Sequence, residues 1–247
     1  MTERKFERPQ VTIIAVGGGG LNIALDLIDA KIFKSYNLIA FDSDSSYYEE
    51  IESKRKNKAL FFSSPPAYDE FLSSTNDLNY YSEDLLDWEE RADGISKIIV
   101  LCTTLGGKIG SSIAPLIGLA ASLQGRFVFS IFSLPSKFEG EQRMARALEA
   151  SKKLIDVSNI SIEQRNDSLS WFSNLKMNEI HVPLIEVFQR IFKQSIYRLA
   201  EGGKYVLEIF SIVPEKYRNP DFVLINTYTN SYRSTPVGYK IKNFTNN

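Results

Sequence analysis

Short apolar runs alternate with segments of helical period through most of this chain of 247 residues. The runs VTIIAV, KIIVLC and RFVFSIFSL, at residues 11–16, 97–102 and 126–134, are apolar almost throughout. Such runs are typical of strands that are covered on both faces, and the segments after them carry apolar residues at helical spacing. Repeated strand–helix units predict an α/β fold with three layers, in which helices cover both faces of a mostly parallel sheet.

The pattern changes towards the end of the chain. A helix is predicted over 182–203, closed by Gly202 and Gly203, and the runs KYVLEIFSIV and DFVLINTY then follow with no helix between them. Strand-like runs without intervening helices favour antiparallel pairing. We therefore predict one α/β domain over residues 1–203 and a small β-rich extension over residues 204–247 that packs on the same domain.

Composition and charge exclude several classes of partner. The formal net charge is −1 and the two signs are mixed along the chain, so the sequence predicts no binding to nucleic acid. The apolar stretch IAPLIGLAASL is far too short to span a membrane, and the charged start MTERKFERPQ predicts no secretory signal. One cysteine, Cys102, and one histidine leave no zinc site, and we expect a buried, reduced thiol in a cytoplasmic protein.

Four consecutive glycines, Gly17 to Gly20, stand where the first predicted strand passes into the first predicted helix. The N-terminus of a helix offers unpaired N–H groups and a partial positive charge, and glycine lets the backbone approach a phosphate closely. A tight turn needs only one or two glycines for packing. The run of four therefore favours phosphate binding over a purely structural turn.

A second glycine-rich turn, LGGKIGSS at residues 105–112, follows the strand predicted over 97–102. It is not a P-loop, because Cys102 stands where that motif needs glycine and Ile109 replaces its Ser or Thr. The first turn also departs from the dinucleotide fingerprint, because Asn22 replaces the third glycine. Two phosphate-binding turns on one sheet edge favour a nucleoside triphosphate, and an NAD-binding enzyme of ordinary Rossmann type is the weaker alternative.

In this order the motifs resemble the nucleotide-binding domain of FtsZ, the bacterial relative of tubulin, over most of residues 11–200. AVGGGGLN resembles the first phosphate loop of that family, and LGGKIGSSIAP resembles a degraded form of its signature MGGGTGTGAAP. SLPSKFEGEQR, RNDSL and PLIEVF resemble later motifs of the same domain, and LIAFDSDSS resembles its second-strand loop. The resemblance implies the three-layer, Rossmann-like fold of the tubulin and FtsZ GTPase domain.

The resemblance implies a site for a guanine nucleotide, GTP or GDP, and it is compatible with a magnesium ion beside the phosphates. The residues that it assigns to the phosphates are Gly18, Gly19, Gly20, Asn22, Gly107, Lys108 and Gly110. The first four would hold the α and β phosphates, and the last three would face the β and γ phosphates. No residue is assigned to catalysis or to metal binding.

Five further residues are implied around the sugar and the base. Glu139 would accept a hydrogen bond from the ribose hydroxyls, Arg143 would lie beside the sugar and phosphates, and Asp44 takes the acidic position of the second-strand loop. Asn166 would meet the base, and Phe188 would stack on it. From the residues alone, simpler interpretations stay open: an i,i+4 ion pair for the first two, a turn at Asn166 and a core ring at Phe188.

Departures from the family pattern limit how much of its activity carries over. Lys193 stands where the family reads guanine with an aspartate, and an ammonium group cannot accept the guanine N–H donors. The family's NxDxxD loop is only half matched by NPDF at 219–222, because Leu224 replaces the second acid. We therefore predict weak or absent GTP hydrolysis. A degenerate FtsZ-like interaction protein with a vestigial pocket is the alternative, and both self-association and binding to another FtsZ-like protein stay open.

Overall fold

The computed structural model describes residues 11–33, 35–42, 59–63, 96–166, 180–200, 223–229 and 237–239. The strands are β1 (Val11–Val16), β2 (Tyr36–Asp42), β3 (Ala59–Ser63), β4 (Ile98–Thr104), β5 (Phe127–Leu134), β6 (Ile160–Arg165), β7 (Val223–Thr229) and β8 (Val237–Tyr239). The helices are α1 (Gly17–Asp29), α5 (Lys108–Leu123), α6 (Glu141–Val157) and α7 (Val182–Ala200), with a short 3-10 helix η1 (Lys137–Glu139).

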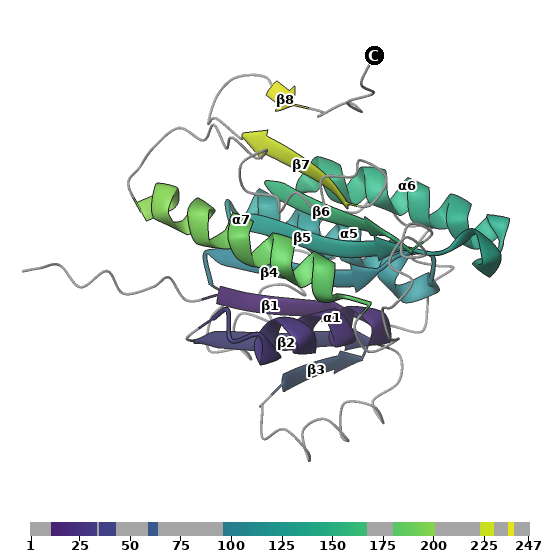
Figure 1. Ribbon diagram of the computed structural model, residues 1–247, viewed down its shortest axis with the longest axis horizontal. Coiled ribbons are helices and arrows are strands. Elements are labelled where there is room, and N and C mark those ends of the chain that lie inside the picture. The colour runs from purple at the N-terminus through teal and green to yellow at the C-terminus, as the bar shows by residue number, and fades with distance from the viewer. Residues whose placement is uncertain are drawn as a thin grey trace, which may run out of the picture.

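The described strands form one sheet in the order β3-β2-β1-β4-β5-β6-β7-β8 (Figure 1). The strands from β3 to β6 in this order are parallel, whereas β7 pairs antiparallel with β6, and β8 antiparallel with β7. The mostly parallel α/β sheet and the antiparallel pairing near the end of the chain are therefore confirmed. The strand predicted over 204–213 lies outside the described residues, and so does the proposed boundary after residue 203.

Helices cover both faces of the sheet, and each face has its own hydrophobic core. In Figure 1, α1 and α7 lie in front of the sheet, and α5 and α6 lie behind it. Alternate residues of β1 enter the two cores: Ile13 packs with residues of α1 and α7, and Ile14 packs with residues of α5 and α6. Burial on both faces explains why the strand runs are apolar almost throughout.

The chain turns to opposite faces after β1 and β4, which are neighbours in the sheet. β1 leads into α1 on one face, and β4 leads through a short turn into α5 on the other. The register pairs Val16 with Thr103, so the two strands end at the same edge. In open α/β sheets, such a change of direction leaves a crevice outside the carboxyl ends of the strands, where ligands bind.

Candidate functional site

α1 begins directly at the end of β1, so the four glycines form its first turn rather than a loop before it. The first predicted helix therefore includes the four glycines and starts at Gly17. Gly17 permits this abrupt start, because its φ of +75° lies in the left-handed region that other residues avoid. No side chain caps α1 and its first turn has no acidic residue, so the free N–H groups keep the partial positive charge of the helix end.

Three of the glycines are required by close packing against β4. A Cβ atom at Gly19 would overlap the side chain of Thr104, and one at Gly20 would overlap the carbonyl group of Cys102. A Cβ atom at Gly110, in the first turn of α5, would overlap the carbonyl oxygen of Thr104. A packing role thus accounts for the missing side chains, and any contact of these glycines with a ligand would be made by the backbone.

The two glycine turns meet at one edge of the sheet. A Cβ atom at Gly17 would lie 3.8 Å from the backbone nitrogen of Gly110, and one at Gly18 would lie 3.8 Å from Asp42 Oδ2. A Cβ atom at Gly107 would have no neighbour within 4 Å, so this residue faces open space. The two helix N-termini therefore converge on one place.

Hydrogen bonds fix the turn between β4 and α5 on both sides of Gly106. Its N–H donates to Ser111 Oγ (2.7 Å), and its carbonyl oxygen accepts from Arg146 Nη1 of α6 (3.0 Å). Gly106 has a φ of +97°, and a Cβ atom there would lie 2.7 Å from Arg143 Cγ, so only glycine fits. Gly107 is the N-cap of α5 and makes no side-chain cap bond, so α5 presents a second set of free N–H groups.

η1 and the start of α6 bring two of the implied residues to this turn. The Ser136 N–H donates to Glu139 Oε1 (2.8 Å), and the Phe138 N–H donates to Ser136 Oγ (3.4 Å), which closes a capping box. Glu139 Oε2 also pairs with Arg143 Nε at 3.1 Å across one helical turn. A cavity of about 560 Å³ lies here, lined by Gly106, Gly107, Glu139, Gly140, Glu141, Gln142, Arg143 and Arg146.

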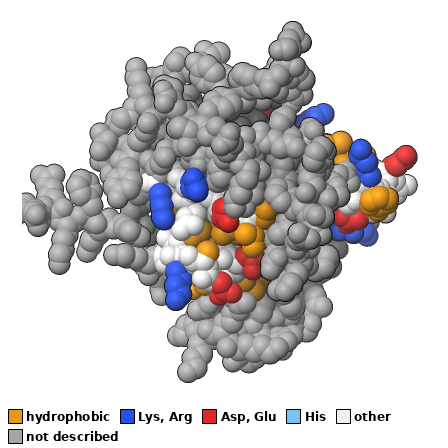
Figure 2. Space-filling model, in the orientation of Figure 1, with side chains coloured by type: hydrophobic (Ala, Val, Ile, Leu, Met, Phe, Trp, Pro, Cys, Tyr) orange, Lys and Arg blue, Asp and Glu red, His pale blue; other side chains and the backbone are white. Residues whose placement is uncertain are grey.

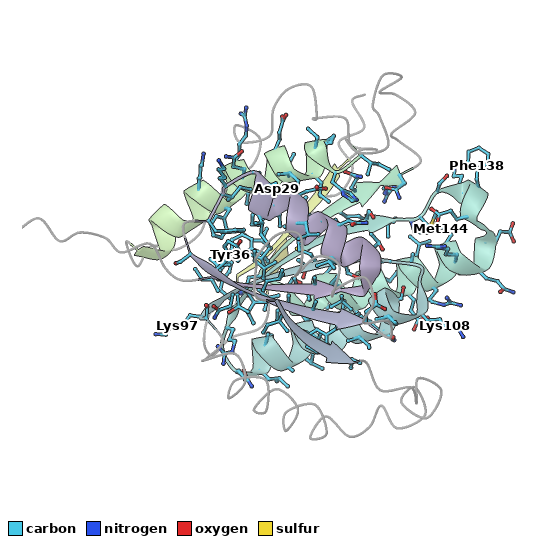
Figure 3. The ribbon with its side chains drawn as sticks, turned by 90° about the horizontal axis from the view of Figure 1, so that it is seen from below. Asp29, Tyr36, Lys97, Lys108, Phe138 and Met144 are labelled. Carbon is cyan, nitrogen blue, oxygen red and sulfur yellow. The ribbon has the colours of Figure 1, made fainter. Side chains whose placement is uncertain are left out.

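Charges of both signs surround this end of the molecule. In Figure 3, Lys108, Phe138 and Met144 lie opposite Tyr36 and Lys97, which stand at the amino ends of β2 and β4. Figure 2 shows basic, acidic and hydrophobic side chains together at the end where α6 begins.

Among the described residues, no group of three His, Cys, Asp or Glu side chains could hold a metal ion, and no helix is long and apolar enough to cross a membrane.

Three other implied residues lie in different places. Asn22 is exposed on the second turn of α1. Asn166 follows β6, and its Oδ1 accepts a hydrogen bond from Gln164 Nε2 (3.4 Å). Asp44 lies outside the described residues, whereas Asp42, at the end of β2, is the acid beside Gly18.

Phe188 does not lie at the sheet edge, and its implied role is corrected. Its side chain is 0% exposed and packs against Phe33, Phe129 and Phe192, with ring centroids 6.0, 5.8 and 5.2 Å away. A ring enclosed in this way has no free face on which a base could stack. The cause is the apolar face of α7, on which Phe188 and Phe192 are four residues apart and point into the core.

Two residues that shape the second turn are missing from the site predicted from the sequence. Arg146 and Ser111 bind the two sides of Gly106, but Arg146 lies outside the matched motifs, and Ser111 is a departure from the signature motif in which it stands. The spacing of Arg143 and Arg146, three residues apart on a predicted helix, places both on one face and is the available signal. The contact of Arg146 with Gly106 could not be predicted from the sequence, because the two residues are separated by 40 residues.

Comparisons with known proteins decide the family. The profile described as "Tubulin/FtsZ family, GTPase domain" matches residues 10–174, well over half of the chain. The chain belongs to the Tubulin/FtsZ family. Cell division protein FtsZ of Aquifex aeolicus (strain VF5) is 26% identical to this FtsZ-like chain over 178 residues, which cover 69% of the chain and 46% of that protein. The chain spans about half the length of the curated relatives that it matches.

Solved structures show the same fold. CetZ from Methanosaeta thermophila strain DSM 6194 has a TM-score of 0.55 at 18% identity, and the match covers 76% of this FtsZ-like chain and 54% of the CetZ chain. CetZ1 from Haloferax volcanii, solved as a GDP bound monomer, has a TM-score of 0.53 at 18% identity, and the match covers 78% of this chain and 65% of the CetZ1 chain. The resemblance to the FtsZ and tubulin GTPase domain and its parallel, Rossmann-like sheet are thus confirmed.

Proposed function

We propose that this FtsZ-like chain binds a guanine nucleotide, GTP or GDP, with the phosphates lying across the two glycine turns. The observation that carries the proposal is that the two glycine turns meet. A Cβ atom at Gly17 would lie only 3.8 Å from the backbone nitrogen of Gly110. Both helices begin without a side-chain cap, so phosphate oxygens can accept hydrogen bonds from two helix ends at once. Family membership supports this assignment, and the related CetZ1 is a GDP bound monomer.

The residues around the turns suit the phosphates and the sugar. We assign the phosphates to Gly18, Gly19, Gly20, Asn22, Gly107, Lys108 and Gly110. Glu139 would accept from the ribose hydroxyls, and Arg143, which uses its Nε on Glu139, keeps further N–H donors for the sugar and phosphates. A magnesium ion would be bound by phosphate oxygens and waters, because this ion keeps much of its hydration shell.

The base of the proposed ligand has fewer assigned contacts than the phosphates and the sugar. We assign it to Asn166 and leave Phe188 in the core. Lys193 is exposed on α7 and offers no acceptor to the guanine N–H groups. The preference for guanine is therefore proposed from the family, and the binding experiment below compares guanine with adenine.

Hydrolysis is proposed to be weak or absent in the isolated protein. The position of the second acid of the family loop is occupied by Leu224, which lies in β7 and pairs with Glu163 of β6. A leucine side chain has no carboxylate with which to position a water molecule. We expect the protein in the cytoplasm, where its one thiol stays reduced.

Isothermal titration of the purified protein with GTP, GDP and ATP tests the proposal. We expect heat with GTP and GDP and less with ATP. Gly107→Asp is the informative variant, because aspartate is a favoured N-cap, fits the open space and places a carboxylate where phosphate would bind. It should abolish binding and keep the fold, whereas Lys152→Gln, with the same change in net charge on the exposed face of α6, should keep binding. Absence of heat with all three nucleotides at high micromolar concentration overturns the proposal.

A second candidate function is docking on another FtsZ-like protein, with the pocket vestigial. The observation that favours it is Phe138, which is 99% exposed at η1 beside the cavity. Exposed aromatic rings are frequent anchors of protein interfaces. Co-purification with a filament-forming FtsZ-like protein that is lost in Phe138→Ser and kept in Gly107→Asp would support this function, and the reverse pattern would exclude it.

A further inference from the structure

We propose that Arg146 is a positioning residue that fixes the direction of the Gly107 N–H group and thereby the phosphate affinity of the second glycine turn. The part on affinity rests on the proposed function, whereas the direction of the N–H group does not. The inference starts from one contact, in which Arg146 Nη1 donates to the carbonyl oxygen of Gly106 over 3.0 Å.

The Gly106 carbonyl and the Gly107 N–H belong to one planar peptide unit. In a trans peptide the C=O and N–H bonds point in opposite directions, and the described residues contain no cis peptide. A carbonyl held toward Arg146 therefore turns the Gly107 N–H away from that side chain. Within the described part of the chain, this N–H has no hydrogen-bond partner of its own, so it is available to a ligand.

Glycine on both sides makes this peptide unit easy to rotate. Its rotation changes ψ of Gly106 and φ of Gly107, and neither residue has a Cβ atom to resist a positive φ. Gly107, with a φ of −73°, also has open space around it. The bond from the Gly106 N–H to Ser111 Oγ does not prevent the rotation, because that N–H belongs to the preceding peptide unit. Arg146 supplies the hydrogen bond that holds the unit in place.

A rotated peptide would reverse the polarity of the turn. Gly107 is the N-cap of α5 and lines the same cavity as Arg146. After rotation, a carbonyl oxygen would replace an N–H donor at the place proposed for a phosphate. Phosphate would then meet a partial negative charge and lose one charge-assisted hydrogen bond. Affinity for the phosphates should therefore depend on a side chain of α6 through its hold on the backbone.

A simpler role for Arg146 is a positive charge near the ligand, and it makes a different prediction. A charge would act on the nucleotide only and leave the backbone of the nucleotide-free protein unchanged. The three-bond couplings between the amide proton and the α protons of Gly107, measured by NMR, separate the two roles, because they report φ of Gly107 without any ligand and do not respond to a nearby charge.

Arg146→Met, which removes the donor, is compared with Arg146→Lys, which keeps a donor, and with Lys152→Met on the same helix. In the nucleotide-free protein, we expect the Gly107 couplings to change in Arg146→Met, to return toward wild type in Arg146→Lys and to stay unchanged in Lys152→Met. Titration with GTP should show roughly tenfold weaker binding for Arg146→Met, as expected for one lost hydrogen bond to a charged group. Arg146→Lys should recover most of that loss.

Unchanged Gly107 couplings in Arg146→Met overturn the inference, whatever happens to binding. If the couplings change while the wild-type protein binds no nucleotide, the positioning role stands and the proposed function fails. If the couplings change, the wild type binds and Arg146→Met binds equally well, the claimed effect on affinity is overturned. Arg146 is exposed, so thermal unfolding of the variants should match the wild type and serve as the folding control.

Discussion

Gly20 and Gly107 differ in what a side chain would meet, although both stand in glycine-rich turns. A Cβ atom at Gly20 would overlap the carbonyl group of Cys102, whereas one at Gly107 would meet nothing within 4 Å. We expect Gly20→Ala to lower the free energy of unfolding by about 1–3 kcal/mol, because it forces α1 away from β4. Gly107→Ser, at a φ of −73° and with a residue that is favoured at the N-cap, should change it by less than about 0.5 kcal/mol. Urea unfolding measures both, and equal losses would contradict the packing argument.

Cys102 is the one thiol of the chain, and it is free and fully buried in β4. Burial raises the pKa of this thiol, so at neutral pH it stays protonated, and the thiolate is the form that reacts with alkylating reagents. We expect iodoacetamide to leave the folded protein unlabelled at neutral and mildly alkaline pH and to label it fully in denaturant. Mass spectrometry measures the labelled fraction. Fast labelling of the folded protein would show that β4 is accessible.

At the scale of the helix, Phe188 of α7 packs in the core. This packing role and the stacking role implied by the family resemblance predict different GTP affinities for a Phe188 variant. Phe188→Leu nearly conserves the buried volume and should lower the free energy of unfolding by less than about 1.5 kcal/mol, against about 3–5 kcal/mol for Phe188→Ala. GTP affinity of Phe188→Leu should equal that of the wild type, because the ring is 0% exposed. Stacking on the base would instead cost about 1–3 kcal/mol of binding free energy. Titration of a folded Phe188→Leu protein decides between them.

Strands with an apolar pattern are predictable from this sequence, and β6 shows where that signal ends. Its sequence, ISIEQR, buries Ser161, Glu163 and Gln164. Glu163 is stabilised by partners, since Ser151 Oγ donates to its Oε2 (2.7 Å) and Arg165 Nε to its Oε1 (3.1 Å). Buried polar groups interrupt the apolar run, and a partner such as Ser151 of α6 is not visible in a local pattern. The start of α1 was also missed, because helix propensity alone does not allow a helix to begin with four glycines.

At the scale of the whole molecule, the site depends on the sheet order, which local patterns do not contain. Two glycine turns after two buried strands are visible in the sequence, and so is the expectation that parallel strands end at one edge. Only the assembled sheet shows that β1 and β4 are neighbours. This arrangement brings Gly17 close to Gly110. The same holds for Arg146 and Gly106. The family resemblance indicated that the two glycine turns lie at one site. It also assigned Phe188 to the ligand, because a motif match does not show whether a side chain is buried.

The coupling of ligand binding to global stability gives the last prediction. A nucleotide that binds only the folded protein should add about 2.7 kcal/mol to its stability at a concentration of 100 times the dissociation constant. For a chain of this size, that corresponds to a rise in Tm of about 5–10 °C. We expect GTP and GDP to raise Tm in the wild type and in Lys152→Gln, and neither nucleotide to raise it in Gly107→Asp. The unliganded Gly107→Asp protein should unfold at or above the wild-type temperature, because the new carboxylate caps α5. A Gly107→Asp protein that is still stabilised by GTP would place the phosphates away from the N-terminus of α5, and the nucleotide would then have to bind without the second glycine turn.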